Sequence, residues 1–246
     1  MIWSQADIIF PVHSVPEAGP LPPGSERLKL KTPDGDTLHG VHIAPTHKGR
    51  EKILVVGFGG NGWNAEDVAS YLHELYPAAH IVTFHYRGYR PSTGRPSAEA
   101  LLSDAPLVFD AAVKAVKPQR TIVAGFSIGS GIAASLAGRR HFDGVILVTP
   151  FDSLKAVANS LYPWLPIGIF FHHEIDAAGG LNGSDVPVAI LAAERDEIIP
   201  SSRTDALRKR VPNLVFDRTI ARAGHNDIYH RSDFQLAMRE AVDALH

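Results

Sequence analysis

Residues 120–139, RTIVAGFSIGSGIAASLAGR, join a short apolar stretch to a run of small and apolar residues with helical spacing. The first part predicts a buried strand over 120–125, and the second predicts a helix over 128–139. Between them stands the pattern Gly125-x-Ser127-x-Gly129. Where a strand turns sharply into a helix, the central residue takes a positive φ, and only very small residues fit two positions before and after it. The stretch therefore predicts a strained serine at the start of a helix, where free N–H groups favour developing negative charge.

The rest of the chain predicts an α/β fold around this unit. From residue 52 onward, short apolar runs alternate with helical patterns, which is typical of a parallel sheet with crossover helices. Before them, 26–32 and 37–44 alternate polar and apolar residues around the turn Asp34-Gly35, which indicates an antiparallel hairpin. We therefore expect a doubly wound α/β domain of about eight strands in a mostly parallel sheet, with helices on both faces. Further strands are predicted at 53–58, 80–85, 144–149, 188–193 and 214–221, and further helices at 65–75, 98–116 (kinked or split at Pro106), 154–161, 201–211 and 232–245.

A chain of 246 residues in this pattern predicts one domain, over 26–246, after an irregular lead over 1–25. The gap between the strands that end at 149 and begin at 188 holds a short lid-like insertion, residues 150–187. It is long enough to cover a cleft and too short to form a cap domain.

The composition narrows the chemistry. The chain has no cysteine, which excludes disulfides, thiolate metal sites, iron–sulfur clusters and a cysteine nucleophile. Its 24 Lys and Arg against 26 Asp and Glu give no electrostatic reason to expect nucleic acid as a partner. The most apolar stretch, 161–171, contains two prolines and falls well short of the roughly 20 residues that span a bilayer, and residues 1–10 lack the basic start of a signal peptide. We expect a soluble, cytoplasmic protein, with the periplasm left open, that has no integral membrane segment and acts on a small or acyl substrate; its oligomeric state stays open.

A serine nucleophile needs a histidine base and a carboxylate that orients it. After a strand-to-helix serine of this kind, the acid and then the histidine follow in loops after later strands. Asp196 follows the strand predicted at 188–193, and His225 follows the strand predicted at 214–221. We therefore predict Ser127, Asp196 and His225 as the catalytic residues. Competing carboxylates are Glu194, Glu197, Asp152 and Asp227.

Other kinds of site remain as alternatives. Gly57 to Gly62 matches GxGxxG, and Arg87 after the next strand leaves an NADP-binding oxidoreductase open. A P-loop is excluded because the chain has no Gly-Lys pair, and a short-chain dehydrogenase is excluded because no tyrosine has a lysine four residues on. The histidine clusters at 172–174 and 225–230 lack the spacing of a known metal site, so we predict no metal and no cofactor. A non-catalytic scaffold protein of the same fold is the third alternative.

With these residues in view, the chain resembles the α/β-hydrolase superfamily. Within it, the chain is similar to the small cap-less subgroup of bacterial serine hydrolases related to eukaryotic protein depalmitoylases. The resemblance covers about 26–246 and rests on Gly59-Gly60-Asn61, Tyr86-Arg87-Gly88-Tyr89 with Ser92 and Gly94, the turn at Ser127, Thr149 to Leu154, Tyr162 to Pro166, Asp196 with Pro200, and Gly224 to Asp227. It implies an esterase- or thioesterase-type serine hydrolase whose oxyanion hole consists of the N–H groups of Ile128 and Asn61, or Gly60 if the alignment shifts by one. His85 and Arg90 depart from the subgroup's usual residues, so the resemblance does not supply a substrate.

The loops near the predicted catalytic edge carry aromatic and aliphatic side chains that can line an apolar acyl pocket, or equally belong to the core. Arg87 there can meet an anionic substrate group. The candidates for substrate binding are Trp63, Arg87, Phe126, Phe151, Tyr162, Trp164 and Ile198, with Phe170 and Ile199 as further apolar candidates.

Overall fold

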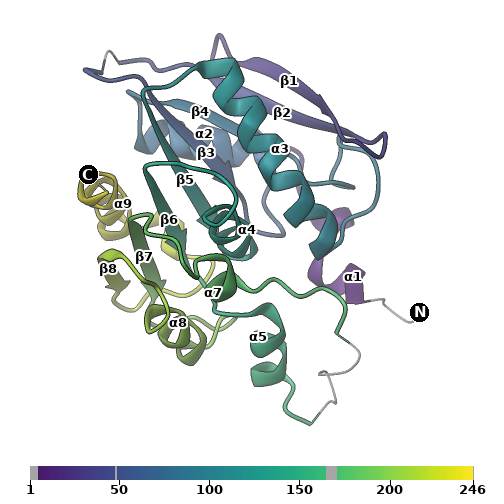
Figure 1. Ribbon diagram of the computed structural model, residues 1–246, viewed down its shortest axis with the longest axis vertical. Helices are drawn as coiled ribbons and strands as arrows, with labels where there is room; N and C mark the ends of the chain where they lie inside the picture. Colours follow the sequence, from purple (N-terminus) through teal and green to yellow (C-terminus); the bar gives the residue numbers. More distant parts are fainter. Residues whose placement is uncertain (1–4, 48, 165–170, 246) are drawn as a thin grey trace. The chain divides into compact units, whose positions relative to one another are not determined.

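The computed structural model describes residues 5–47, 49–164 and 171–245. Eight strands form one mostly parallel sheet in the order β1-β2-β4-β3-β5-β6-β7-β8. The strands are labelled in Figure 1. The strands are β1 (Glu26–Lys31), β2 (Thr37–Ile43), β3 (Ile53–Phe58), β4 (His80–Phe84), β5 (Arg120–Phe126), β6 (Gly144–Val148), β7 (Val188–Ala193) and β8 (Leu214–Ile220). The fold class predicted from the sequence is confirmed.

Helices accompany the strands in alternation along the chain. They are α1 (Gln5–Ile9), α2 (Ala65–Leu75), α3 (Ala98–Val116), α4 (Ile128–Leu136), α5 (Leu154–Leu161), α7 (Ala177–Gly180), α8 (Ser201–Arg208) and α9 (Ser232–Ala244), with 3-10 turns η1 (Val12–Ser14) and η2 (Ile228–His230). Four of them begin after a capping side chain: Asn64, Ser97, Ser153 and Asp176 accept hydrogen bonds from N–H groups of the first turns of α2, α3, α5 and α7. No helix in the described ranges is long and apolar enough to cross a membrane.

The chain divides into two compact units, Met1–Val123 and Ala124–His246. In the first unit, β1 pairs with β2 and β2 with β4 in antiparallel fashion, and β3 pairs with β4 in parallel. Helix α2 packs closely on β3, because a Cβ added to Gly57 would lie only 2.6 Å from the Leu72 side chain. Strands β1 and β2 form the predicted antiparallel hairpin, which lies at one edge of the sheet.

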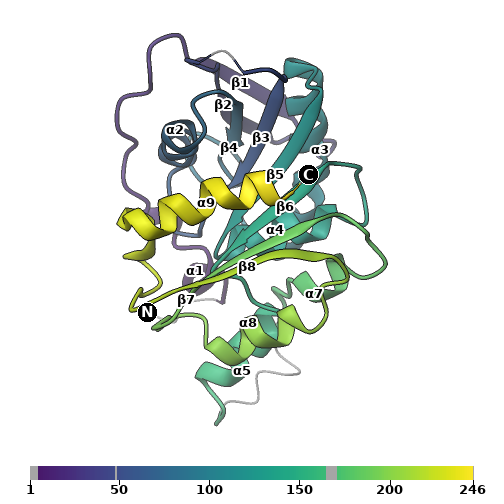
Figure 2. The same cartoon turned by 90° about the vertical axis from the view of Figure 1, so that its left-hand side faces the viewer.

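In the second unit, β6, β7 and β8 are parallel neighbours. Helix α4 is buried along its whole length, and α7 packs against it so closely that a Cβ on Gly180 would lie 2.9 Å from the Ser135 nitrogen. Helix α9 contacts all three strands and lies in front of the sheet in Figure 2. The core of this unit is therefore built around α4, β6 and β7.

Several predicted boundaries change for local reasons. Pro106 lies inside α3, which continues as one helix, so the predicted split of this helix at Pro106 is wrong. Helix α8 ends at Arg208 rather than 211, since Pro212 disfavours helical backbone at the residue before it. Helix α4 ends at Leu136 rather than 139, two residues before Gly138. The segment before β1 is not wholly irregular, because α1 and η1 lie in it and Phe10 between them is buried. The boundaries of a single domain over 26–246 and of an insertion over 150–187 stay a prediction.

Candidate active site

Ser127 lies at the junction of β5 and α4 with a strained backbone. Its φ is 52° and its ψ is −119°, a conformation that residues with side chains rarely adopt. Gly125 makes this turn possible, because a Cβ there would lie 2.3 Å from the carbonyl oxygen of Gly129. The N–H of Ser127 donates to the carbonyl of Val148 on β6 at 2.9 Å. The sequence prediction of a strained serine between two small residues is therefore confirmed.

The structure brings Ser127 together with His225 and Asp196, which all belong to the second unit. The Nε2 atom of His225 lies 3.0 Å from the Ser127 hydroxyl oxygen, and its Nδ1 atom lies 2.9 Å from both carboxylate oxygens of Asp196. Because the Asp196 carboxylate only accepts, Nδ1 carries the proton and Nε2 is free to accept from the serine. The side chains of both His225 and Asp196 are buried, so the hydrogen bond between them is shielded from water.

Asp196 is held in place by its own loop. Its Oδ1 atom accepts from the N–H groups of Ile198 at 2.9 Å and Ile199 at 2.7 Å. A short side chain that bonds to the backbone two and three residues on is typical of a tight Asp turn. These two bonds hold the Asp196 carboxylate in place independently of its contact with the His225 ring.

The competing carboxylates have other partners. Glu194 accepts from the Arg222 N–H at 2.7 Å, and Glu197 accepts from the backbone N–H of His225 at 3.1 Å. Asp227 accepts from the Gly224 N–H at 2.7 Å. Asp152 pairs with Arg203 at 3.4 Å. Among these five acids, Asp196 is the one that contacts the histidine ring.

Tyr229, which the sequence analysis missed, packs behind the hydrogen-bonded residues Ser127, His225 and Asp196. Its ring contacts Phe126 edge-on with 6.0 Å between centroids, and contacts Phe234 at 5.9 Å. Burial raises the pKa of Tyr229 to about 12, with the Asp196 charge adding to the shift and a bond to Thr149 opposing it. The phenol is therefore neutral at any pH at which the site would work. Its position four residues after His225 was the only sequence signal.

The glycine loop after β3 lies in the first unit. Its Gly59 carbonyl accepts from the part-buried Tyr86 hydroxyl at 2.7 Å, and the Asn61 side chain donates to the carbonyl of Ile9 at 2.9 Å. The Gly60 carbonyl accepts from the Trp63 N–H at 3.2 Å. The loop is thus anchored within its own unit, by the Tyr86 side chain and by the Ile9 carbonyl; the sequence analysis named Tyr86 only as part of the family motif and gave it no role. Ile128, the other predicted oxyanion donor, is the first residue of α4.

The sequence analysis expected the guanidinium of Arg87 to be free to bind an anion, and in the structure it is bonded to three aspartates. Its Nε and Nη2 atoms donate to Asp104 at 3.0 and 2.6 Å, and Nη1 donates to Asp34 and Asp36. Both Arg87 and Asp104 are buried, and the bonds to Asp104 and Asp34 raise the pKa of Arg87 further. The arginine ties the hairpin turn to α3, so its proposed contacts with a substrate anion or with a 2′-phosphate lose their basis.

The other substrate-binding candidates do not share one environment. Phe126 and Phe151 are fully buried core residues of the second unit, and Trp63 packs on Tyr71 with 5.4 Å between ring centroids. Ile198, Tyr162 and Trp164 are exposed, Trp164 by 73%, and Tyr162 and Trp164 contact each other at 5.9 Å. Phe170, Leu165 and Pro166 lie outside the described residues.

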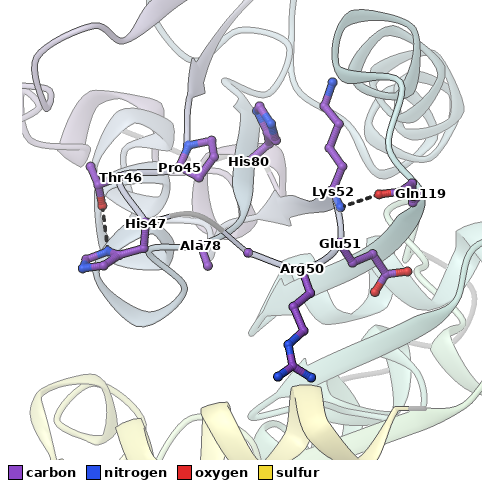
Figure 3. A pocket seen from close by; sticks show the side chains of 10 residues that line it. Pro45, Thr46, His47, Arg50, Glu51, Lys52, Ala78, His80 and Gln119 are labelled. Atoms are coloured by element: carbon purple, nitrogen blue, oxygen red, sulfur yellow. Dashed lines mark hydrogen bonds between the residues drawn. The ribbon is translucent and has the colours of Figure 1, made fainter.

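A hollow of about 560 Å³ in the first unit does not belong to this site. It lies at the amino ends of β3 and β4, whereas ligands of open α/β sheets bind at the carboxyl ends. Figure 3 shows its two long cations, Arg50 and Lys52, pointing in opposite directions. Across the described residues, no three His, Asp or Glu side chains are grouped as metal ligands.

Comparisons with known proteins agree with this architecture. Residues 53–175, half of the chain, match the family described as alpha/beta hydrolase fold. The Mycobacterium tuberculosis protein Rv2307c is 30% identical over 233 residues, which cover 92% of this chain and 82% of that protein. A lysophosphatidylserine lipase from Danio rerio is 32% identical over 139 residues, but these cover only 49% of this chain and 36% of the lipase.

Solved structures show the same fold. An esterase from Pyrococcus furiosus is similar with a TM-score of 0.74 at 16% identity, covering 94% of this chain and 96% of the esterase. An alpha-beta serine hydrolase homologue from Coxiella burnetii has a TM-score of 0.66 at 20% identity, covering 90% and 97%. The family match over half of the chain and the 30% identity to Rv2307c show that the chain belongs to the α/β-hydrolase superfamily.

Proposed function

We propose that the protein is a serine hydrolase that cleaves an ester or thioester through an acyl-enzyme intermediate. The observation that carries the proposal is the continuous chain of hydrogen bonds from Ser127 through His225 to Asp196. A hydroxyl is a weak nucleophile by itself, and a histidine within hydrogen-bond reach that is oriented by a carboxylate is the arrangement that activates it.

In the first step, His225 Nε2 takes the proton of the Ser127 hydroxyl as its oxygen attacks the acyl carbon. Asp196 keeps the imidazole in the required tautomer and stabilises the imidazolium that forms. The proton then goes to the leaving alkoxide or thiolate, and the acyl-enzyme remains. A water molecule then attacks the acyl carbon while the same imidazole takes its proton. The bond from the acyl carbon to the Ser127 oxygen breaks, the imidazolium returns the proton to that oxygen, and the acid is released.

The tetrahedral oxyanion of both steps needs backbone donors. We propose the N–H of Ile128, which follows the nucleophile at the start of α4, as the first. The family resemblance adds the N–H of Asn61, or of Gly60 under the shifted alignment. Losing one such donor typically raises the barrier by about 2.7–4 kcal/mol.

For the bond that is cleaved, we propose a class of bond and no individual substrate. The superfamily resemblance and the esterase- and lipase-named relatives favour a carboxylester, and the likeness to the depalmitoylase-related subgroup adds a thioester. An amide is the harder substrate for the same chemistry. Neither a cofactor, a metal nor a nucleic acid enters the proposal.

The test is a panel of p-nitrophenyl esters and acyl thioesters of increasing chain length, together with labelling by a fluorophosphonate probe. The wild type should turn over at least one substrate and label at Ser127, and Ser127→Ala should lose both. Ser135→Ala is the matched control, because that hydroxyl lies on the same helix and bonds only to the carbonyl of Ile132. A wild type that neither labels nor hydrolyses any member of the panel would overturn the proposal.

A further inference from the structure

The loop after β7 carries three carboxylates, and each accepts a hydrogen bond from a different donor of the segment 222–225. Glu194 accepts from the Arg222 N–H at 2.7 Å, and Asp196 accepts from the ring of His225 at 2.9 Å. Glu197 accepts from the backbone N–H of His225 at 3.1 Å. The histidine is therefore held at two points, its ring by Asp196 and its main chain by Glu197.

Backbone bonds join the same two loops. The N–H of Glu194 donates to the Ile220 carbonyl at 3.1 Å, and the N–H of Arg195 donates to the Ala223 carbonyl at 2.8 Å. Neither of these backbone bonds reaches past Ala223. For the main chain of 224–225, the hydrogen bond from this loop that the structure gives is the one to the Glu197 carboxylate. The fit there is close, since a Cβ on Gly224 would lie 2.9 Å from the Glu197 carboxylate oxygen.

Glu197 makes this contact although the residue as a whole is exposed. An exposed glutamate ordinarily keeps its carboxylate in water, and here the side chain turns back to an N–H group. A hydrogen bond to an ionised acceptor is about twice as strong as a neutral one. Gly224, the residue before His225, is the residue type with the greatest backbone freedom. Its own N–H is held by Asp227 at 2.7 Å, and the Glu197 bond fixes the next N–H, that of His225.

We propose that Glu197 is a positioning residue of the hydrolase: by fixing the main chain of His225, it keeps Nε2 within reach of Ser127. The inference rests on the proposed function of Ser127, Asp196 and His225. It assigns no contact with substrate to Glu197, whose effect passes through the histidine.

The test compares Glu197→Ala with Glu197→Gln, which keeps an acceptor oxygen. Glu240→Ala is the matched control, because it removes the same charge from an exposed pair with Arg218. Rates on the best p-nitrophenyl ester are corrected for active enzyme by titration with the fluorophosphonate. We expect kcat to fall about tenfold in Glu197→Ala with KM within about twofold, kcat of Glu197→Gln to lie within about threefold of wild type, and Glu240→Ala to match wild type.

A second measurement does not need turnover. The proton on Nδ1 of His225, hydrogen-bonded to Asp196, should give a downfield proton NMR signal that Asp196→Asn removes. In Glu197→Ala we expect this signal to broaden through faster exchange with water, and in Glu197→Gln to persist. If Glu197→Ala keeps both the wild-type kcat and the wild-type signal, the inference is overturned while the proposed function stands. If the wild type is inactive and unlabelled, the proposed function fails, and the NMR signal alone decides whether Glu197 positions the histidine.

Discussion

Replacing Gly125 by alanine tests the strained turn on which the candidate site depends. The added Cβ would lie 2.3 Å from the Gly129 carbonyl oxygen and 2.7 Å from the Ser130 Cα. Both neighbours are backbone atoms of the turn and of the buried α4 helix, so neither can rotate away as a flexible side chain would. Relief requires that the main chain around Ser127 moves.

The size of the effect follows from these distances. Ordinary contacts of a Cβ begin at 3.4 Å, so the turn must open by about 1 Å. Overpacking of this kind costs about 1–3 kcal/mol of stability, which corresponds to a decrease in Tm of about 2–4 °C per kcal/mol for a chain of this size. A displacement of about 1 Å at reacting groups costs on the order of 100-fold in rate. We therefore expect a rate about 100-fold below wild type in a protein whose Tm is about 2–12 °C lower.

Gly138→Ala is the control, because its Cβ would meet nothing closer than the Gly180 carbonyl oxygen at 3.6 Å. It lies just beyond the same helix and should leave kcat unchanged, with a stability equal to wild type or higher by up to about 1 kcal/mol. The assays are ester hydrolysis, the rate of fluorophosphonate labelling, and thermal unfolding. If Gly125→Ala retains labelling within threefold of wild type and the same Tm, the argument from the strained turn is wrong.

Three further predictions concern charge and protonation. Arg87→Met should lower the free energy of unfolding in urea by about 3–5 kcal/mol, because it leaves the buried carboxylate of Asp104 without its partner; a loss below 1 kcal/mol would contradict the structural role of Arg87. Burial lowers the pKa of His85 in the folded protein, against the opposing charge of Glu66, so the unfolded chain binds more protons below its ordinary value of 6.5 and stability should fall as the pH drops. A Tm measured from pH 8 to 5 should decline less in His85→Phe than in wild type, and equal declines would refute the assignment. The raised pKa of Tyr229, about 12, means that its contribution to stability is complete below pH 10 and is lost as the pH rises through 12; difference absorbance against Tyr229→Phe should show no tyrosinate from this residue below about pH 11.

Much of the fold was predictable because local and long-range patterns agree. Strands β3 and β7 and helices α2, α3 and α5 have the predicted boundaries, and the three helices begin at Asn, Ser and Ser caps that are visible in the sequence. Helix α1 was not predictable in the same way. Its residues QADII carry no helical repeat, and the segment is fixed by tertiary contacts such as the buried Phe10 and the bond from Asn61 to Ile9.

Arg87 shows where residue type and loop position mislead. An arginine after a strand in a glycine-rich turn is compatible with an anion site, and the sequence cannot reveal that three aspartates from two distant segments converge on it. Asp34 and Asp36 lie in the β1–β2 turn, more than 50 residues before Arg87. Only the folded chain brings these charges together, and they consume the guanidinium's hydrogen-bonding capacity.

The choice among the acids after β7 shows how far a physical reading of the sequence can go. Position in the chain predicted Asp196, with Glu194 and Glu197 of the same loop among the competing acids. The structure adds that Asp196 bonds back to the N–H groups of Ile198 and Ile199, a turn that requires a short side chain and that leads into α8 just after Pro200. A glutamate is one methylene longer and cannot make this turn with the same geometry. The sequence Asp-x-Ile-Ile-Pro before a helix therefore already contained a reason to prefer Asp196, while the tasks of Glu194 and Glu197 depend on donors of a loop nearly 30 residues away and were accessible only from the folded structure.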